Sequence, residues 1–204
     1  MNAALNDKAI KALMSAGKNI VEPINDSALQ AASIDLKLGN TSYEYSFDKY
    51  ILGDEIGENL VSKKEFETLP VESGESVFVR IYEKISIPDN TIGIIFPRSS
   101  ITRLGIQIMP VYMNPGYSGY MPLTIINHLK CQIILKPGRR IAQLVLLSTG
   151  DRPETLYNEQ KGSKYYGENL DPSKLHDDQD IKKMMDQIIA RDAPTLYNMM
   201  NKKP

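Results

Sequence analysis

The chain has 204 residues, of which 42% are hydrophobic, with 24 Lys and Arg against 25 Asp and Glu. This composition is typical of a globular protein and excludes a disordered or fibrous chain. The net charge of −1 gives no general attraction to nucleic acid or to an anionic membrane. No apolar run approaches the roughly 18 residues that a membrane span requires. We therefore expect a cytoplasmic protein with neither nucleic acid nor membrane as a partner.

The N-terminal residues predict a short helix, because Asn6 can cap it and Gly17 can end it. The pattern changes at residues 33–38, where apolar and polar side chains alternate as in a half-buried strand. Gly39 and Asn40 then predict a turn.

Residues 75–148 read almost entirely as strands and turns. The expected strands cover 77–81, 91–96, 120–127, 131–135 and 141–147. Many short strands with tight turns predict a mainly β fold, either a sandwich or a barrel.

The single cysteine, Cys131, stands in an apolar run, which predicts a buried and inert thiol. One cysteine and two histidines cannot supply the ligands that a zinc deaminase needs. The sequence therefore indicates no zinc and no metal site formed by the protein alone.

The last part of the chain contains a polar segment and an apolar stripe. Residues 151–178 are rich in Gly, Pro and Tyr and show no period, which indicates a loop or a tail. The stripe that follows is typical of an amphipathic helix and is formed by Ile181, Met184, Met185, Ile188 and Ile189. We predict one domain over residues 1–178 and a helical extension over 179–204, which packs on its own core or on another subunit.

The first segment that could carry chemistry is 97–105. Arg98 stands beside Ser99 and Ser100 just after a buried strand, so this short piece offers charged and neutral donors to phosphate oxygens. In the alternative interpretation, the two serines cap a helical turn while the arginines pair with carboxylates.

The second segment is 114–119, in which a proline and two glycines predict a tight turn that can approach a ligand closely. Tyr117 could place its flat ring against a sugar or a base. The alternative is an ordinary hairpin turn with a packed tyrosine.

Five motifs together resemble the dCTP deaminase and dUTPase superfamily, and they occur in its order: 33–39, 97–105, 114–119, 140–144 and 164–167. The helical N-terminus is similar to that of the dCTP deaminase branch. The resemblance implies a distorted β-barrel of the β-clip type, assembled as a homotrimer with active sites between subunits. It also implies a pyrimidine deoxynucleoside triphosphate as substrate, with magnesium on its phosphates.

The resemblance further implies a set of nucleotide-binding residues: Arg98, Ser99, Ser100, Arg103, Asn114, Tyr117, Gln143, Tyr157, Lys164 and Glu168. Arg98 and the two serines would hold phosphates, and Arg103 would reach a neighbouring site. Tyr117 would stack under the deoxyribose. Tyr157 and Lys164 would close over the triphosphate, and Glu168 stands where the deaminase branch has glutamine.

Two departures from the family lie in its catalytic region, to which Arg103 also belongs. The glutamate that activates water in the deaminase branch is Thr124 here, and the aspartate of the dUTPase branch is Asn114. Neither residue can accept the proton of water as a general base. Asp35 matches a carboxylate of both branches, and its role is open between ligand binding and structural hydrogen bonding.

Three functions therefore remain open. The chain could be a dCTP deaminase that uses a carboxylate from elsewhere, such as Glu75, Glu83 or Asp89, or it could be a dUTPase. It could also be a catalytically inactive nucleotide sensor, sponge or regulator. The glycine-rich terminal motif of dUTPases is missing from the chain.

Overall fold

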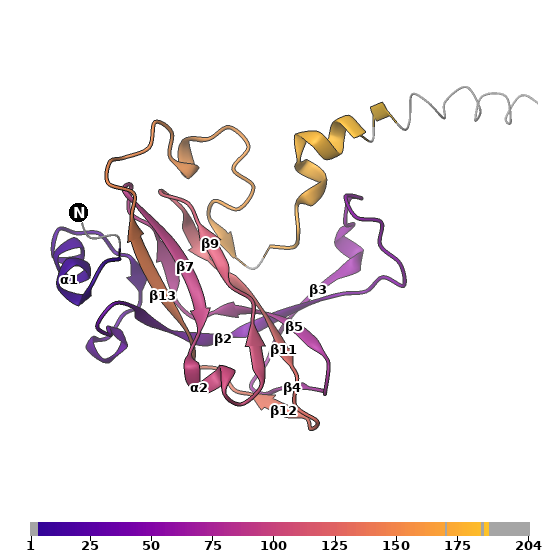
Figure 1. Ribbon diagram of the computed structural model, residues 1–204. Coiled ribbons are helices and arrows are strands. Elements are labelled where there is room, and N and C mark those ends of the chain that lie inside the picture. Colours follow the sequence, from indigo (N-terminus) through magenta and orange to yellow (C-terminus); the bar gives the residue numbers. More distant parts are fainter. Residues whose placement is uncertain (1–3, 170, 185, 188–204) are drawn as a thin grey trace, which may run out of the picture. The chain divides into compact units, whose positions relative to one another are not determined.

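The computed structural model describes residues 4–169, 171–184 and 186–187 (Figure 1). The chain divides into two compact units. The first comprises the residues up to Glu44 together with Ser62–Asp171, and the second comprises Tyr45–Val61 together with the residues from Pro172 onward. The predicted boundary between residues 178 and 179 stays a prediction.

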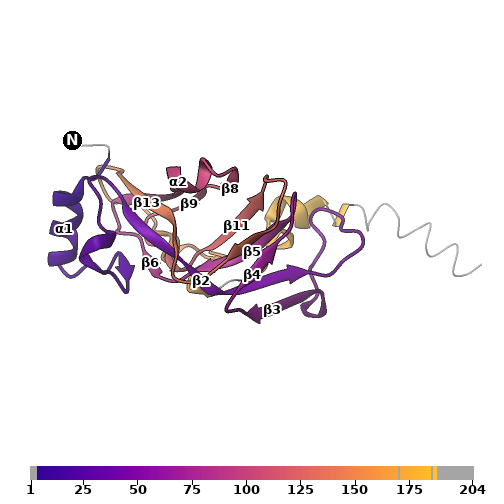
Figure 2. The same ribbon diagram turned by 90° about the horizontal axis from the view of Figure 1, so that it is seen from below.

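The first unit is mainly β, as predicted. Its largest sheet has the strand order β8-β11-β5-β2-β13-β7-β9, with β3 paired to β2. The strands are β2 Ile34–Tyr45, β3 Val61–Glu65, β5 Ser76–Ile81, β7 Thr91–Pro97, β8 Ile106–Ile108, β9 Val111–Met113, β11 Pro122–Asn127 and β13 Arg140–Ser148. This sheet curls into an open, distorted barrel, which confirms the predicted architecture (Figures 1 and 2).

Two smaller sheets complete the first unit. One has the order β1-β6-β10-β14, in which β14 runs parallel to β10, and the other pairs β12 with β4. The strands are β1 Val21–Glu22, β4 Leu69–Val71, β6 Lys84–Ser86, β10 Ser118–Tyr120, β12 Ile133–Leu135 and β14 Glu168–Asn169. Because β14 comes from the tail, the predicted loop over residues 151–178 includes a strand.

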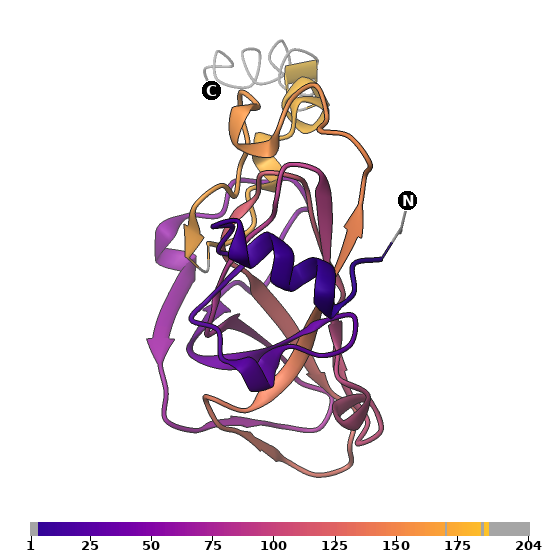
Figure 3. The same cartoon turned by 90° about the vertical axis from the view of Figure 1, so that its left-hand side faces the viewer.

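The predicted N-terminal helix is confirmed as α1, Asp7–Ser15. The Asn6 side chain accepts a hydrogen bond from the amide of Ala9 at 3.0 Å, and Gly17 has a φ of +82° just beyond the last turn. The helix lies across one end of the strands (Figure 3), where Ile10 is fully buried in the core.

The core of the first unit follows from alternation along the strands. On β5, Val77, Val79 and Ile81 point inward and are buried. Residues of β7 and β13 alternate in the same way. Each fully buried aliphatic side chain contributes about 1.5–3 kcal/mol to stability, so this shared core holds the barrel together.

The turn predicted at Gly39 and Asn40 is wrong, because β2 continues through both residues. The strand pairs with β13 in its first half and with β5 beyond, and its register on β5 shifts between Leu38 and Ser42. A Cβ atom at Gly39 would lie 2.6 Å from the carbonyl oxygen of Arg80. The glycine therefore permits a close approach of two backbones rather than a reversal of the chain.

The prediction of a buried thiol at Cys131 is also wrong, because this residue is exposed. The strand of this region is only β12, so Cys131 precedes it in the connection from β11. The carbonyl oxygen of Cys131 accepts a hydrogen bond from the Asn127 side chain at 2.9 Å. The backbone of Cys131 is thus fixed by the buried Asn127, while the residue itself is exposed.

The second unit contains the 3-10 turns η2, Glu58–Leu60, and η4, Leu175–Asp177. The rings of Tyr45, Phe47 and Tyr50 follow one another at centroid distances of 5.3 and 5.1 Å. The Ser173 amide donates to the Tyr45 hydroxyl at 2.9 Å.

The predicted amphipathic helix is helical over residues 179–184 and 186–187. Met185, Ile188 and Ile189, which were included in its apolar stripe, lie outside the described residues. None of the helices in the described parts of the chain has the length and apolarity needed to cross a membrane.

Candidate functional site

The first candidate segment forms the junction between β7 and a short helix, α2, Ser99–Thr102. Arg98 occupies the N-cap position with extended backbone, and its amide donates to the carbonyl of Ile141 at 3.0 Å. Neither serine is the N-cap, so that part of the alternative interpretation is wrong. Ser99, Ser100 and the following Arg103 are exposed and can meet a ligand.

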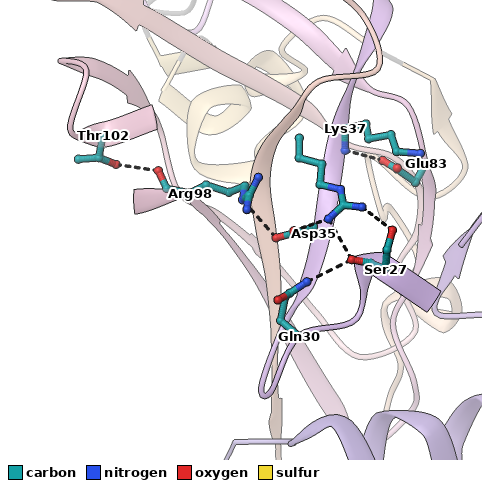
Figure 4. A network of polar contacts seen from close by, with 8 residues as sticks. Ser27, Gln30, Asp35, Lys37, Glu83, Arg98 and Thr102 are labelled. Atoms are coloured by element: carbon teal, nitrogen blue, oxygen red, sulfur yellow. Dashed lines mark hydrogen bonds and ion pairs between the residues drawn. The ribbon is translucent and has the colours of Figure 1, made fainter. Parts of the chain in front are cut away.

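A buried carboxylate lies between two arginines beside this junction (Figure 4). Asp35 of β2 is 3% exposed, with Oδ1 3.4 Å from Nε of Arg98 and Oδ2 3.3 Å from Nη1 of Arg140. The arginine side chains are 35% and 31% exposed. One negative and two positive charges leave a net positive charge at a partly open surface, which favours an anion.

Arg140 is held from a second side by the 3-10 turn η1, Asp26–Ala28. It donates to the carbonyl oxygen of Ser27 at 2.9 Å and to the hydroxyl of the same residue. Gln30 also donates to the carbonyl of Ser27, at 3.2 Å (Figure 4). Neither Ser27 nor the contacts of Arg140 were predicted from the sequence, although this arginine begins one of the five motifs.

Gln143 lies close to the same cluster. On β13 it pairs with Asp35 of β2 on one side and with Phe96 of β7 on the other, and it is half-buried. Two of the predicted binding residues, Arg98 and Gln143, are thus brought together around Asp35. Asp35, whose role was left open by the sequence, thus holds Arg98 and Arg140 in place through ion pairs.

The two positions that depart from the family pattern lie on different segments, one on β11 and the other after β9. Thr124 is half-buried on β11, opposite Phe78 of β5, and its carbonyl oxygen accepts from the amide of Met109 at 3.1 Å. Asn114 is half-buried after β9, and its carbonyl oxygen accepts from the amide of Tyr117 at 3.1 Å. Both side chains remain neutral at any pH at which the protein folds.

The other predicted binding residues form a second group, in which the tail meets the glycine-rich turn. Tyr117 is only 4% exposed, and its hydroxyl donates to Oε1 of Glu168 at 2.7 Å. Burial, and then the nearby Glu168 carboxylate, raise the pKa of Tyr117 well above its usual range, so the phenol keeps its proton.

Tyr157 belongs to the same group. Its ring centroid is 6.1 Å from that of Tyr117, and its amide donates to the carbonyl of Pro115 at 2.9 Å. The Tyr157 hydroxyl accepts from the amide of Tyr165 at 3.0 Å, and Lys164 places its ammonium group 5.9 Å from the ring of Tyr165.

The carboxylates considered as substitute bases are in different environments. Glu83 is 3% exposed, and its Oε2 accepts from the amide of Lys37 at 2.9 Å (Figure 4). Burial raises the pKa of Glu83, and the hydrogen bond from Lys37 opposes that rise. Glu75 accepts from the amide of Glu72 at 2.6 Å, and Asp89 is half-buried. Glu83 and Glu75 therefore already hold backbone groups.

Within the described ranges, no group of three or more His, Cys, Asp or Glu side chains has an arrangement suited to a metal ion. The carboxylate that pairs with Arg98 is Asp35, and both of its oxygens face arginines. This donor set favours an anion over a bare cation.

A comparison with family models matches residues 4–149 to the model described as dCTP deaminase-like. The chain belongs to the dCTP deaminase-like family. A "dCTP deaminase, dUMP-forming" from Methanosphaera stadtmanae is 31% identical over 193 residues, which are 88% of this chain and 97% of the relative. A protein of the same description from Methanopyrus kandleri is 34% identical over 187 residues, 84% of this chain and 95% of the relative.

A solved structure supports the fold of this family member. The crystal structure of 2'-deoxycytidine 5'-triphosphate deaminase from Agrobacterium tumefaciens aligns with a TM-score of 0.57 at 21% identity. The alignment covers 72% of this chain and 48% of the other, so the chain spans about half of that protein.

Proposed function

We propose that this member of the dCTP deaminase-like family binds a pyrimidine deoxynucleoside triphosphate, dCTP or dUTP. The observation that supports this proposal best is the buried Asp35 between Arg98 and Arg140, beside the exposed hydroxyls of Ser99 and Ser100. Guanidinium and hydroxyl donors together suit the oxygens of a polyphosphate. Because Asp35 engages Arg98 through Nε, the terminal nitrogens of this arginine can donate to a phosphate.

The remaining predicted residues take supporting parts in this proposal. Arg103, which is exposed after α2, would reach the site of a neighbouring subunit. Gln143 would donate its amide near the phosphates, and Asn114 would hydrogen-bond the 3′-hydroxyl of the sugar. Tyr157 and Lys164 of the tail would close over the triphosphate.

Magnesium would enter this site on the phosphates of the nucleotide. Asp35 is occupied by two arginines, so the metal would be held by phosphate oxygens and water, as is usual for Mg²⁺ in nucleotide sites. The magnesium ion would neutralise part of the negative charge of the triphosphate. Arg98, Ser99 and Ser100 would then orient the chain of phosphates.

Assembly as a homotrimer with sites between subunits is part of the same proposal. The outer face of the sheet β13-β7-β9 carries a continuous apolar row in which Ile94 pairs with Val145 on one side and with Tyr112 on the other. Tyr112 is 54% exposed, and Phe96 on the same face is 38% exposed. Such a face is suited to packing against further copies of the chain.

Turnover of dCTP to dUMP is the second candidate, and the names of the two archaeal relatives favour it. In that reaction one water molecule adds to C4 of the cytosine and ammonia leaves. A second water molecule cleaves the bond between the α and β phosphates and releases pyrophosphate.

Both steps of that reaction need a base to accept a proton from water. Thr124 and Asn114 cannot act as that base, and Glu83 and Glu75 are engaged with backbone amides. Because the carboxylates of the deaminase and dUTPase branches are replaced by Thr124 and Asn114, we place binding as a sensor, sponge or regulator of nucleotide pools ahead of turnover.

One experiment separates the candidates. The purified protein is incubated with dCTP or dUTP and magnesium, the products are resolved by chromatography, and binding is measured by calorimetry on the same preparation. We expect binding without product, and we expect Arg98→Ala to weaken binding at least tenfold while the exposed control Lys130→Ala does not. Formation of dUTP, dUMP or pyrophosphate would establish turnover, and the lack of any binding would refute the proposed function.

A further inference from the structure

The tail of the chain fills the glycine-rich turn of the same subunit. A Cβ atom at Gly116 would lie 2.8 Å from Oδ1 of Asn158 and 2.9 Å from Cβ of Leu156. A Cβ atom at Gly119 would lie 3.0 Å from the carbonyl oxygen of Glu168 and 3.1 Å from its Cγ. Both positions thus leave little room for a side chain, because tail side chains approach Gly116 and both the backbone and the side chain of Glu168 approach Gly119.

Backbone hydrogen bonds continue this contact along the turn. The amide of Gly167 donates to the carbonyl of Ser118 at 2.7 Å. From there β14 runs parallel to β10, with Glu168 beside Gly119 and Asn169 beside Tyr120. The tail is therefore an added strand at the edge of the sheet β1-β6-β10-β14.

At the end of this strand and just past it, basic side chains also contact the tail. Arg80 donates to the side chain of Asn169, and Lys63 donates to its carbonyl at 3.1 Å. Lys63 also lies 3.9 Å from a carboxylate oxygen of Asp171. The Lys63 side chain is 45% exposed, so water competes with its contacts.

The bond between Tyr117 and Glu168 differs from these contacts because both residues are 4% exposed. A hydrogen bond to a carboxylate is about twice as strong as one between neutral groups, and water does not reach this one. This side-chain bond joins a buried residue of the turn to a buried residue of the tail. In the sequence, Lys164 stands between Tyr157, whose amide donates to Pro115, and Glu168. The tail is therefore held on the turn on both sides of Lys164.

We propose that Glu168 is a positioning residue that acts through Tyr117. Its carboxylate holds the tail on the turn and keeps the ring of Tyr117 in one orientation, and thereby places Tyr157 and Lys164 for the nucleotide. This role rests on the proposed nucleotide binding. It also explains how a carboxylate is tolerated where the deaminase branch has glutamine, because the charge points at a phenol and not at phosphates.

The test uses three variants of the full chain and one control. Glu168→Ala removes the acceptor, and Tyr117→Phe removes the donor but keeps the ring. Glu168→Gln removes the charge but keeps an oxygen that can accept the bond. Glu154→Gln makes the same chemical change at an exposed position of the same tail.

Two quantities are measured for each protein: hydrogen exchange at the amides of Gly167 and Glu168 without nucleotide, and the affinity for dCTP with magnesium by calorimetry. We expect about tenfold faster exchange and about tenfold weaker affinity in Glu168→Ala and Tyr117→Phe, corresponding to one lost hydrogen bond. Glu168→Gln should stay within about threefold of the wild type, and the control should not change. Rescue by glutamine but not by alanine separates positioning from a general loss of stability.

The outcomes distinguish the two proposals. If the wild type binds dCTP and both Glu168→Ala and Tyr117→Phe bind it equally well, the positioning role is wrong and the proposed function stands. If the wild type binds no nucleotide, the proposed function fails and the role of Glu168 in affinity fails with it. Should Glu168→Ala not fold, Tyr117→Phe provides the same comparison.

Discussion

At the scale of single residues, the charge arrangement around Asp35 explains how two arginines stay near one another. Two guanidiniums repel, and a carboxylate placed between them converts this repulsion into two attractions. A buried carboxylate alone would be strongly unfavourable, so the three groups stabilise one another. Removing the carboxylate therefore affects both arginines.

We predict that Asp35→Asn lowers the free energy of unfolding by about 2 kcal/mol, because both arginines lose their ion pair with the buried carboxylate. The loss is limited because the two arginine side chains remain partly solvated. Urea denaturation measures this change. Asp151→Asn, which makes the same change at an exposed position, should alter stability by less than about 0.5 kcal/mol. Equal stability of Asp35→Asn and the wild type would mean that the arginines do not depend on Asp35.

Glu83 gives a prediction about pH. Burial raises the pKa of Glu83 in the folded protein above its ordinary value of 4.5, so the folded state binds this proton more tightly than the unfolded state. The stability that this proton contributes is complete below about pH 4.5 and is lost as the pH rises through the raised pKa. Glu83→Gln has no such proton, but its amide oxygen can still accept from Lys37.

The melting temperature of Glu83→Gln relative to the wild type should therefore increase as the pH rises from about 4 to about 8. Calorimetry in a series of buffers measures this difference, and Glu67→Gln is the exposed control. A difference that stays constant with pH, or that decreases, would contradict the assignment of Glu83 as a carboxyl group with a raised pKa.

At the scale of elements, features determined by a few neighbouring residues were predictable from the sequence. The cap at Asn6, the helix α1 and the alternation along β5 all follow from short-range patterns, and the structure confirms them. Gly39 was misread because a glycine signals either a reversal or a close approach. Only the position of Arg80, on a different strand, decides between the two.

This misreading leads to a prediction for β2. Gly39→Ala would place a methyl group 2.6 Å from a backbone oxygen that cannot move without shifting β5. We expect a loss of about 1–3 kcal/mol, as for other overpacked sites, measured by urea denaturation. Asn40→Ala, at the exposed neighbouring position, should cost little; equal costs at both positions would show that the two strands separate easily.

The geometry of the candidate site was predictable to the extent that its residues stand close together in the sequence. Arg98 and the two serines were predicted as phosphate donors from one segment, whereas the position of Asp35 relative to Arg140, 105 residues away, was not predicted. The bond between Tyr117 and Glu168 joins residues 51 positions apart. No local pattern encodes such pairs, because they depend on which strands become neighbours.

At the scale of the whole molecule, the apolar outer face of β13-β7-β9 should determine the assembly state. Ile94→Asp places a charge in the centre of that face, and we expect it to reduce the particle mass from about three times the 22.9 kDa of the chain to that of a single chain. Light scattering during gel filtration measures this mass. Ile134→Asp, at an exposed position on β12, is the control and should keep the wild-type mass. A wild type that is already a single chain would refute the proposed trimer.

The central position of β13 has a further consequence during synthesis of the protein on the ribosome. This strand lies between β2 and β7 and also carries Arg140, so Asp35 has its second arginine only after residues 140–148 have left the exit tunnel. Until then β2 and β7 are exposed edges, and pairing over such long separations is slow. Co-translational folding of the cluster around Asp35 is thus delayed until residues 140–148 have emerged, late in the synthesis of the 204-residue chain, and nascent chains that stall before that point keep these strand edges unpaired.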